Sequence, residues 1–257
     1  MERHEYDTMA QVERHHWWYV GMRQIAATFI AQIPAPHTII DAGCGTGGNL
    51  VWLGNYGTAV GFDMSPEALA YAQSCRTAVC QASIDEIPIA TASADLVTSF
   101  DVIYHRAVRD DAAAVRECAR ILKPGGYFLL RVPANDWLRG YHDERVHTAR
   151  RYSRAQVEAL CTQAGLLVTR LSFANTILFP VAVLQRMSER GSGHSGKRSD
   201  LTTPSHTTAL VGSMALRLEA WLLSVGVHMP YGVSLICLAQ RPLAPFQDGV
   251  PDATASS

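Results

Sequence analysis

Four glycines occur within residues 41–50, DAGCGTGGNL, directly after the apolar stretch HTII. Glycine allows a backbone to pass close to a ligand where any side chain would collide with it. Gly43, Gly45 and Gly48 have the spacing G-x-G-x-x-G, which is typical of a loop that holds a dinucleotide at a helix N-terminus. Asp63 follows Asp41 at the distance where an acidic residue can accept ribose hydroxyls. The spacing therefore predicts a ligand that contains a nucleoside.

Asp41 favours one kind of nucleoside over another. A carboxylate two residues before the first glycine would oppose a pyrophosphate arriving at the helix N-terminus, and would favour a ligand with an ammonium group. S-adenosylmethionine has an ammonium group and a sulfonium, and has no phosphate. An NAD-dependent oxidoreductase or epimerase remains an alternative, although YAQSC has Cys75 where a Y-x-x-x-K motif would need lysine. A binding module of the same fold without turnover is a second alternative.

The elements that must position these residues alternate between strands and helices. Predicted strands are a short one ending at Asp41 and those at 58–63, 77–82, 93–101, 127–133, 166–174 and 232–240; predicted helices are 8–32, 48–57, 65–75, 110–122, 153–165, 176–188 and 207–225. This alternation predicts an α/β fold, a Rossmann-like, doubly wound and mostly parallel seven-stranded sheet with an N-terminal lid helix and a C-terminal helical insertion. Ligands of such sheets bind outside the carboxyl ends of the strands.

Composition limits the class of protein. The 257 residues are 48% apolar with a net charge of -1, which argues against a broad nucleic-acid footprint. We expect a lid region at 1–35, a main α/β domain at 36–245 with an insertion at about 176–225, and a disordered tail at 246–257. The polar start has no signal-peptide core, so a cytoplasmic protein is expected, with peripheral contact at the inner membrane surface as a further possibility. The six cysteines show no zinc spacing, and we expect reduced thiols and no metal.

Four stretches resemble, in order, the motifs of class I S-adenosylmethionine-dependent methyltransferases. They are DAGCGTGG, VGFDMSPEALAYA, SIDEIPIATASADLVTSFDVIYH and RECARILKPGGYFLLRVP, within about residues 36–135. The resemblance implies S-adenosylmethionine as the cofactor, with Asp41 facing its ammonium group directly or through water and Asp63 accepting both ribose hydroxyls. The family usually has aspartate where Ser83 stands. The implied cofactor contacts are Asp41, Gly43, Gly45, Gly47, Asp63, Met64, Ser83, Ile84 and Phe100.

A narrower resemblance includes the leader ERHHWWYVGMR and the later HDERVHTARRYS. Both stretches are similar to those of a bacterial group with an H-W-W leader and an H-x-R-R-Y motif. Members of that group often look like envelope-saccharide or lipid-pathway methyltransferases. The chain also resembles, more distantly, quinone-pathway O-methyltransferases, some of which carry a glutamate for a metal where Tyr104 stands here. The resemblance implies a small-molecule or lipid-linked acceptor, with O-methylation the best guess, and no metal.

Histidines could supply a base if the acceptor keeps a proton at neutral pH. His105 follows the fourth strand and could take that proton as a neutral imidazole, or could simply bond to nearby backbone. His142 and His147 form a second cluster with Asp143. The catalytic candidates are therefore His105, His142 and His147.

Aromatic and basic residues are candidates for binding the acceptor. Trp18 could cover the site while Arg23 turns inward, although at least one leader tryptophan should be ordinary core. Arg150 and Arg151 could fork onto an anionic acceptor, or pair with Asp143 or Glu144. The predicted substrate-binding residues are Trp18, Arg23, Tyr104, Arg150, Arg151 and Tyr152.

The apolar helices at 176–188 and 207–225 have two interpretations. They could form a hairpin that caps the domain, which we favour. They could instead form an interfacial patch or a greasy channel for a lipid-linked acceptor.

Overall fold

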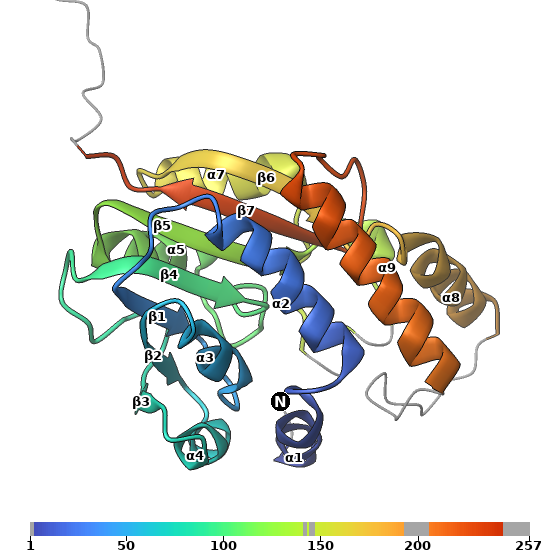
Figure 1. Cartoon of the computed structure of the whole chain (residues 1–257), viewed down its shortest axis with the longest axis horizontal. Coiled ribbons are helices and arrows are strands. Elements are labelled where there is room, and N and C mark those ends of the chain that lie inside the picture. Colours follow the sequence, from blue (N-terminus) through green and yellow to red (C-terminus); the bar gives the residue numbers. More distant parts are fainter. Residues whose placement is uncertain (1–2, 141–142, 144–146, 193–205, 244–257) are drawn as a thin grey trace, which may run out of the picture.

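The computed structural model describes residues 3–140, 143, 147–192 and 206–243. Its centre is a seven-stranded sheet in the order β3-β2-β1-β4-β5-β7-β6 (Figure 1). β7 pairs antiparallel with both of its neighbours, and the other pairs are parallel. The strands are β1 (Thr38–Ala42), β2 (Thr58–Asp63), β3 (Ala78–Gln81), β4 (Ala94–Phe100), β5 (Leu122–Pro133), β6 (Leu167–Ala174) and β7 (Ser234–Gln240). The predicted α/β sheet is therefore confirmed.

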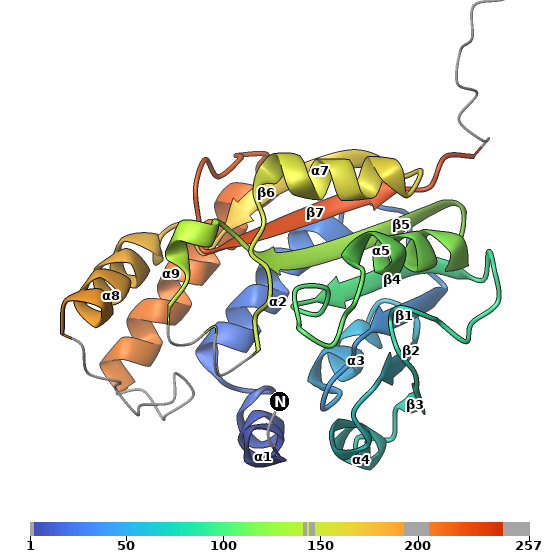
Figure 2. The ribbon, with the colours of Figure 1, turned by 180° about the vertical axis from the view of Figure 1, so that it is seen from behind.

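Helices cover both faces of the sheet because the strand side chains that point to either face are apolar. Ile39, Leu96 and Leu129 pack in one core cluster with the helices on the face seen in Figure 1. Val97 and Phe128 pack in the other cluster, on the face seen in Figure 2. The elements outside the sheet are α1 (Arg3–Val12), α2 (Trp17–Ile30), α3 (Gly48–Leu53), α4 (Pro66–Ser74), α5 (Asp111–Ile121), the 3-10 turn η1 (Asp136–Leu138), α7 (Arg154–Gln163), α8 (Phe179–Ser192) and α9 (His206–Ser224). Burial on both faces explains the near-continuous apolar runs of the strands.

Local signals placed several helix starts correctly. Ser65 accepts the N–H of Ala68 and precedes Pro66, as its position at the start of α4 predicted. Ser153 and Gln156 form a capping box at the start of α7. Helices α8 and α9 lie between β6 and β7 along the chain.

Two predicted boundaries were wrong. The single helix predicted at 8–32 is two helices, because His16 is extended and its Nδ1 accepts the N–H of Trp18 as the N-cap of α2. The fifth strand begins at Leu122 rather than residue 127, since Leu122 already pairs with Ala94 of β4. The break after Val12 allows α1 to fold back beside α4 (Figure 2).

Candidate active site

The glycine loop joins β1 to α3 and lies against the end of β2. The N–H groups of Gly43 and Cys44 both donate to the Phe62 carbonyl at 2.9 Å. Gly43 and Gly47 have φ of +84° and +91°, and a Cβ on Gly43 would lie 2.4 Å from the Val102 side chain. Only glycine meets both demands at low cost, so the loop is a narrow backbone cradle at the start of a helix.

Asp63 connects the glycine loop to the loop that follows β2. One carboxylate oxygen accepts the N–H of Gly45, and the other accepts the N–H of Ser65, both at 2.9 Å. A carboxylate oxygen can accept more than one hydrogen bond, so both oxygens retain capacity for the two hydroxyls of a ribose. Met64 beside it is half exposed, as a residue that lies against a purine would be.

Asp41 is buried beneath the glycine loop. Its position just before the glycines had suggested a more open place at the entrance of the site. Its side chain is 1% exposed. Oδ1 accepts a 2.7 Å hydrogen bond from Thr98, and Oδ2 is buried with no partner among the described residues. Burial raises the pKa of Asp41 to about 7. A buried carboxylate with an unsatisfied oxygen suits a cationic partner, directly or through water.

The N-terminal leader, here residues 3–23, covers the glycine loop. Its contact through Glu13 was not predicted from the sequence. The Gly48 N–H, in the first turn of α3, donates to Glu13 Oε1 at 2.9 Å, and Glu13 is buried. Arg23 donates to the carbonyls of Glu13 and Arg14 at 2.8 and 3.1 Å. Through these contacts Arg23 holds the leader backbone, and its role in binding the acceptor stays a prediction. No local pattern predicts this long-range cap.

Phe100 and Trp18 flank an ion pair between a buried arginine and a partly exposed aspartate, at the ends of β4 and β5. The Arg131 guanidinium carbon lies 5.1 Å from the Phe100 ring centroid and 5.4 Å from that of Trp18. Arg131 donates from Nε and Nη2 to Asp101 Oδ2, at 2.9 and 2.5 Å. Neither charged residue was predicted. An arginine inside the apolar run YFLLRVP, and an aspartate just after a strand, were the available signals.

Comparisons with known proteins now identify the family. The model of a methyltransferase domain family matches residues 40–130. A probable S-adenosylmethionine-dependent methyltransferase of Mycobacterium tuberculosis is 30% identical over 129 residues, 49% of this chain and 46% of that protein. A malonyl-acyl-carrier-protein O-methyltransferase of Enterobacter lignolyticus is 33% identical over 207 residues, 73% of this chain and 79% of that protein. The chain belongs to the S-adenosylmethionine-dependent methyltransferases.

Solved methyltransferase structures share the fold. A possible histamine N-methyltransferase of Thermotoga maritima superimposes with a TM-score of 0.58 at 19% identity, over 93% of this chain and 95% of that one. A methyltransferase of Haloferax volcanii, solved with its activator, gives 0.57 at 23% identity, over 93% and 98%. The chain spans about half the length of the Mycobacterium relative. Family membership makes S-adenosylmethionine the cofactor and decides against the NAD alternative.

The residues around the glycine loop of this methyltransferase fit that cofactor. The glycine cradle would let the backbone pass close to the cofactor. The unsatisfied Asp41 oxygen would face its ammonium group, and Asp63 would bind its ribose. The Ser83 hydroxyl accepts the Asp85 N–H, and the Ile84 side chain is buried in the core. Contact of Ile84 with adenine is therefore limited to its backbone. The adenine roles of Met64, Ser83 and Ile84 remain predictions.

His105 bonds to backbone in the loop after β4. Its Nδ1 accepts the Ala107 N–H at 3.1 Å, so the neutral ring carries its proton on Nε2. Burial and the nearby charges of His147 and Arg106 lower the pKa of His105 to about 4. The His105 and His147 rings meet edge to face at 5.7 Å. These features favour the backbone-bonding interpretation over the base, and predicted His142 lies outside the described residues.

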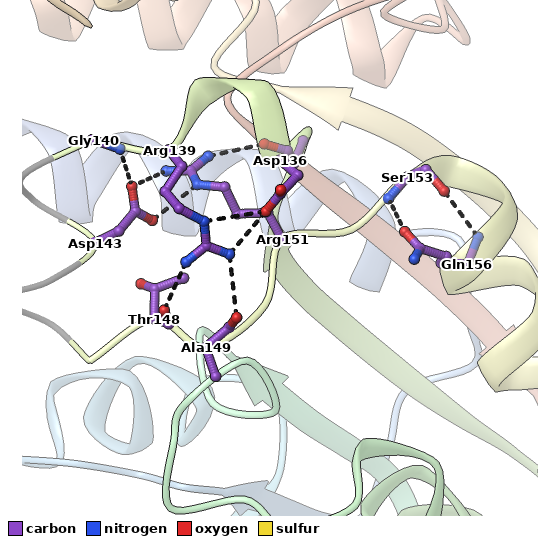
Figure 3. Close-up of polar contacts among 10 residues, drawn as sticks. Asp136, Arg139, Gly140, Asp143, Thr148, Ala149, Arg151, Ser153 and Gln156 are labelled. Atoms are coloured by element: carbon purple, nitrogen blue, oxygen red, sulfur yellow. Dashed lines mark hydrogen bonds and ion pairs between the residues drawn. The ribbon is translucent and has the colours of Figure 1, made fainter. Parts of the chain in front are cut away.

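The R-R-Y residues contact other parts of the chain, and their acceptor-binding roles stay predictions. Arg151 is buried and forks onto Asp143 at 2.9 and 3.1 Å, and its Nη1 donates to the Ala134 carbonyl (Figure 3). Arg150 donates to the carbonyls of Val108 and Arg109. The alternative pairing with Asp143 is the one observed, because a buried guanidinium needs a buried partner.

Tyr152 and Tyr104 also belong to the interior of this region. The Tyr152 hydroxyl donates to Asp111 Oδ2 at 2.8 Å, and Tyr152 is 3% exposed. The Tyr104 carbonyl accepts the N–H groups of Ala149 and Arg150. Burial raises the pKa of Tyr104, which makes its hydroxyl a poor proton acceptor. Among the residues that the structure describes, no three His, Cys, Asp or Glu side chains gather closely enough to hold a metal.

Proposed function

We propose that this chain transfers the methyl group of S-adenosylmethionine to an oxygen of a small-molecule or lipid-linked acceptor. The observation that carries the proposal is the single edge where the glycine cradle, Asp41, Asp63 and Phe100 meet, at the carboxyl ends of β1, β2 and β4. The Enterobacter relative is named as an O-methyltransferase, which favours oxygen over nitrogen.

The acceptor best suited to this site is a carboxylate. S-adenosylmethionine, when bound, would supply a methyl carbon activated by its sulfonium, and the new carbon–oxygen bond would form in line as the carbon–sulfur bond breaks. A hydroxyl must lose a proton in this step, whereas a carboxylate has none to lose. His105 has its Nδ1 occupied and Tyr104 has a raised pKa, so neither offers a ready base.

Protein groups would contribute position and exclusion of water. Trp18 and Phe100 form apolar walls beside Arg131, and the leader covers the loop that holds the cofactor. Such enclosure holds the two reacting atoms in line and keeps water from the sulfonium. The Arg131–Asp101 pair fixes the walls through stacking and two hydrogen bonds.

One observation favours a second candidate, the binding module without turnover. Met9 of the leader lies 3.2 Å from where a Cβ of Gly45 would be, and Glu13 caps the start of α3. A leader that never opened would block the cofactor. The first experiment must therefore measure cofactor binding by itself.

Calorimetry with S-adenosylmethionine and S-adenosylhomocysteine is that experiment. We expect binding by the wild type and at least about 100-fold weaker binding by Asp63→Ala, since two charge-assisted hydrogen bonds contribute roughly 1.5–3 kcal/mol each. Glu86→Ala, an exposed acid at the same edge, is the matched control and should bind normally. Binding of neither compound by the wild type would favour the binding module.

Methyl transfer is then tested with isotopically labelled cofactor and mass spectrometry. The acceptor panel pairs carboxylic acids with alcohols of the same skeleton, free and lipid-linked. Labelled methyl esters from the acids are the expected products. Labelled ethers alone would refute the carboxylate assignment. Amines of the same skeletons complete the panel, and labelling of the amines alone would refute O-methylation.

A further inference from the structure

Helix α9 has a continuous apolar stripe on the side that faces away from the protein. Its members are spaced by one, three or four residues, so they lie on one side of the helix. Each is between 51% and 64% exposed. They are Leu210, Val211, Met214, Leu218, Trp221 and Val225.

The opposite side of α9 is apolar as well. Leu216 and Leu223 are fully buried against α2, and a Cβ on Gly21 of α2 would lie 2.3 Å from Leu216. Glu219 is also buried, accepting the N–H groups of Thr176 and Ile177. A surface helix normally carries charged residues on its outer side. Among the described side chains of α9, Arg217 is the one exposed charge, and it is positive.

Helix α8 is drawn next to α9 in Figures 1 and 2, and it too has exposed apolar side chains. Val181 and Leu184 of α8 are 63% and 67% exposed. We call the exposed apolar side chains of α8 and α9 the α8–α9 face. Within the described part of the chain, no helix is long and apolar enough to cross a membrane. The α8–α9 face could therefore lie on a bilayer but not span it.

We propose that the α8–α9 face docks in the plane of an anionic lipid bilayer. The stripe runs along a helix of 19 residues, about 28 Å long at 1.5 Å per residue. An apolar surface of this length fits a flat bilayer better than it fits a short peptide. In-plane helices bury apolar side chains at the headgroup boundary and place arginine at the phosphates. Arg217 beside the stripe supplies that charge, and Trp221 is the residue type enriched at such boundaries.

Docking at this face would place the acceptor end of the enzyme near the lipid. Helix α9 packs on α2, and α2 carries Trp18, whose ring lies against Arg131. Docking at the α8–α9 face is independent of methyl transfer. Its test therefore uses no cofactor and no acceptor.

Co-sedimentation with vesicles tests the proposal on the full chain. The vesicles contain phosphatidylcholine alone or with phosphatidylglycerol. We expect the wild type to sediment with the anionic vesicles. Met214→Glu/Leu218→Glu should bind at least about tenfold more weakly, because two exposed apolar side chains that docking would bury become charged. Arg217→Glu should lose the preference for anionic over neutral vesicles.

Leu243→Glu is the matched control, because Leu243 is 82% exposed but lies after β7, outside the α8–α9 face. It should sediment like the wild type. Thermal unfolding, with midpoints equal across the variants, establishes that loss of binding is not loss of fold. Absence of wild-type sedimentation with either vesicle overturns the proposal. It is also overturned if the double variant binds vesicles as tightly as the wild type does. A third contrary outcome is a wild-type dimer in analytical ultracentrifugation that the double variant dissociates with no change in vesicle binding.

Discussion

Replacing Asp41 with asparagine should stabilise the cofactor-free protein at high pH while weakening its hold on the cofactor. The carboxylate is buried beneath the glycine loop with one oxygen unsatisfied. Asparagine has nearly the same shape and can still accept the hydrogen bond from Thr98, but it carries no charge. The substitution therefore removes a charge from the interior and leaves the packing in place.

The structure sets the size and sign of this effect. Burial raises the pKa of Asp41 from 3.8 to about 7, a rise of roughly three units. At 1.36 kcal/mol per unit, this amounts to at most about 4 kcal/mol. A raised carboxyl pKa means that the folded state holds a proton that the unfolded state releases. Its contribution is full below pH 3.8 and is lost as the pH rises through 7.

Unfolding in urea between pH 4.5 and 8.5 measures the prediction. Wild-type stability should fall by roughly 3 kcal/mol over this range relative to Asp41→Asn. Asp95→Asn is the control of opposite sign: burial opposes its charge, but hydrogen bonds from Lys123 and two backbone N–H groups lower the pKa of Asp95 overall. That variant should lose stability near neutral pH. Identical pH profiles for wild type and Asp41→Asn would refute the reasoning.

The same variant tests the role of Asp41 in binding. S-adenosylmethionine and S-adenosylhomocysteine both carry an ammonium group, whereas 5′-methylthioadenosine lacks the whole amino-acid tail. Calorimetry should show weaker binding of the first two by Asp41→Asn and unchanged binding of the third. Equal losses for all three would mean that Asp41 shapes the loop and does not meet the ammonium.

Three further predictions concern the surrounding contacts. Arg151→Ala should destabilise the fold by about 3–5 kcal/mol because Asp143 is left buried and unpaired; urea unfolding measures this, and a raised KM without loss of stability would restore its binding role. His105→Gln should keep kcat within about threefold of the wild type, whereas a base would be worth roughly 100-fold or more. Glu13→Ala should speed hydrogen exchange in α1 and leave β4 and β5 protected, since the Gly48 N–H loses its acceptor. Unchanged exchange in α1 would show that Glu13 does not hold the leader closed.

The cofactor half of the site could be predicted because its signals are local. A strand, a glycine turn and a helix follow one another within residues 38–53, and the turn needs glycine for its own backbone. Asp63 ends the next strand in sequence, and parallel neighbours bring their carboxyl ends together. The positions of Gly43, Gly47 and Asp63 along the chain therefore imply their positions in space.

The acceptor half depends on contacts between distant segments. Arg151 could pair with a bound acceptor or with Asp143, and residue types alone do not distinguish the two. Arg131 and Trp18 come from β5 and the leader, and their meeting depends on how α2 packs across the sheet.

The sequence by itself determined the sheet, the cofactor loop and the family motifs, because periodicity, capping residues and glycine turns act over a few neighbouring residues. Tertiary structure alone decided that Glu13 caps α3, that Asp41 is buried, and that α9 turns an apolar stripe outward. The reason is physical: burial and pairing are properties of segments that meet only after the chain has folded, and the charge state of each group follows from them.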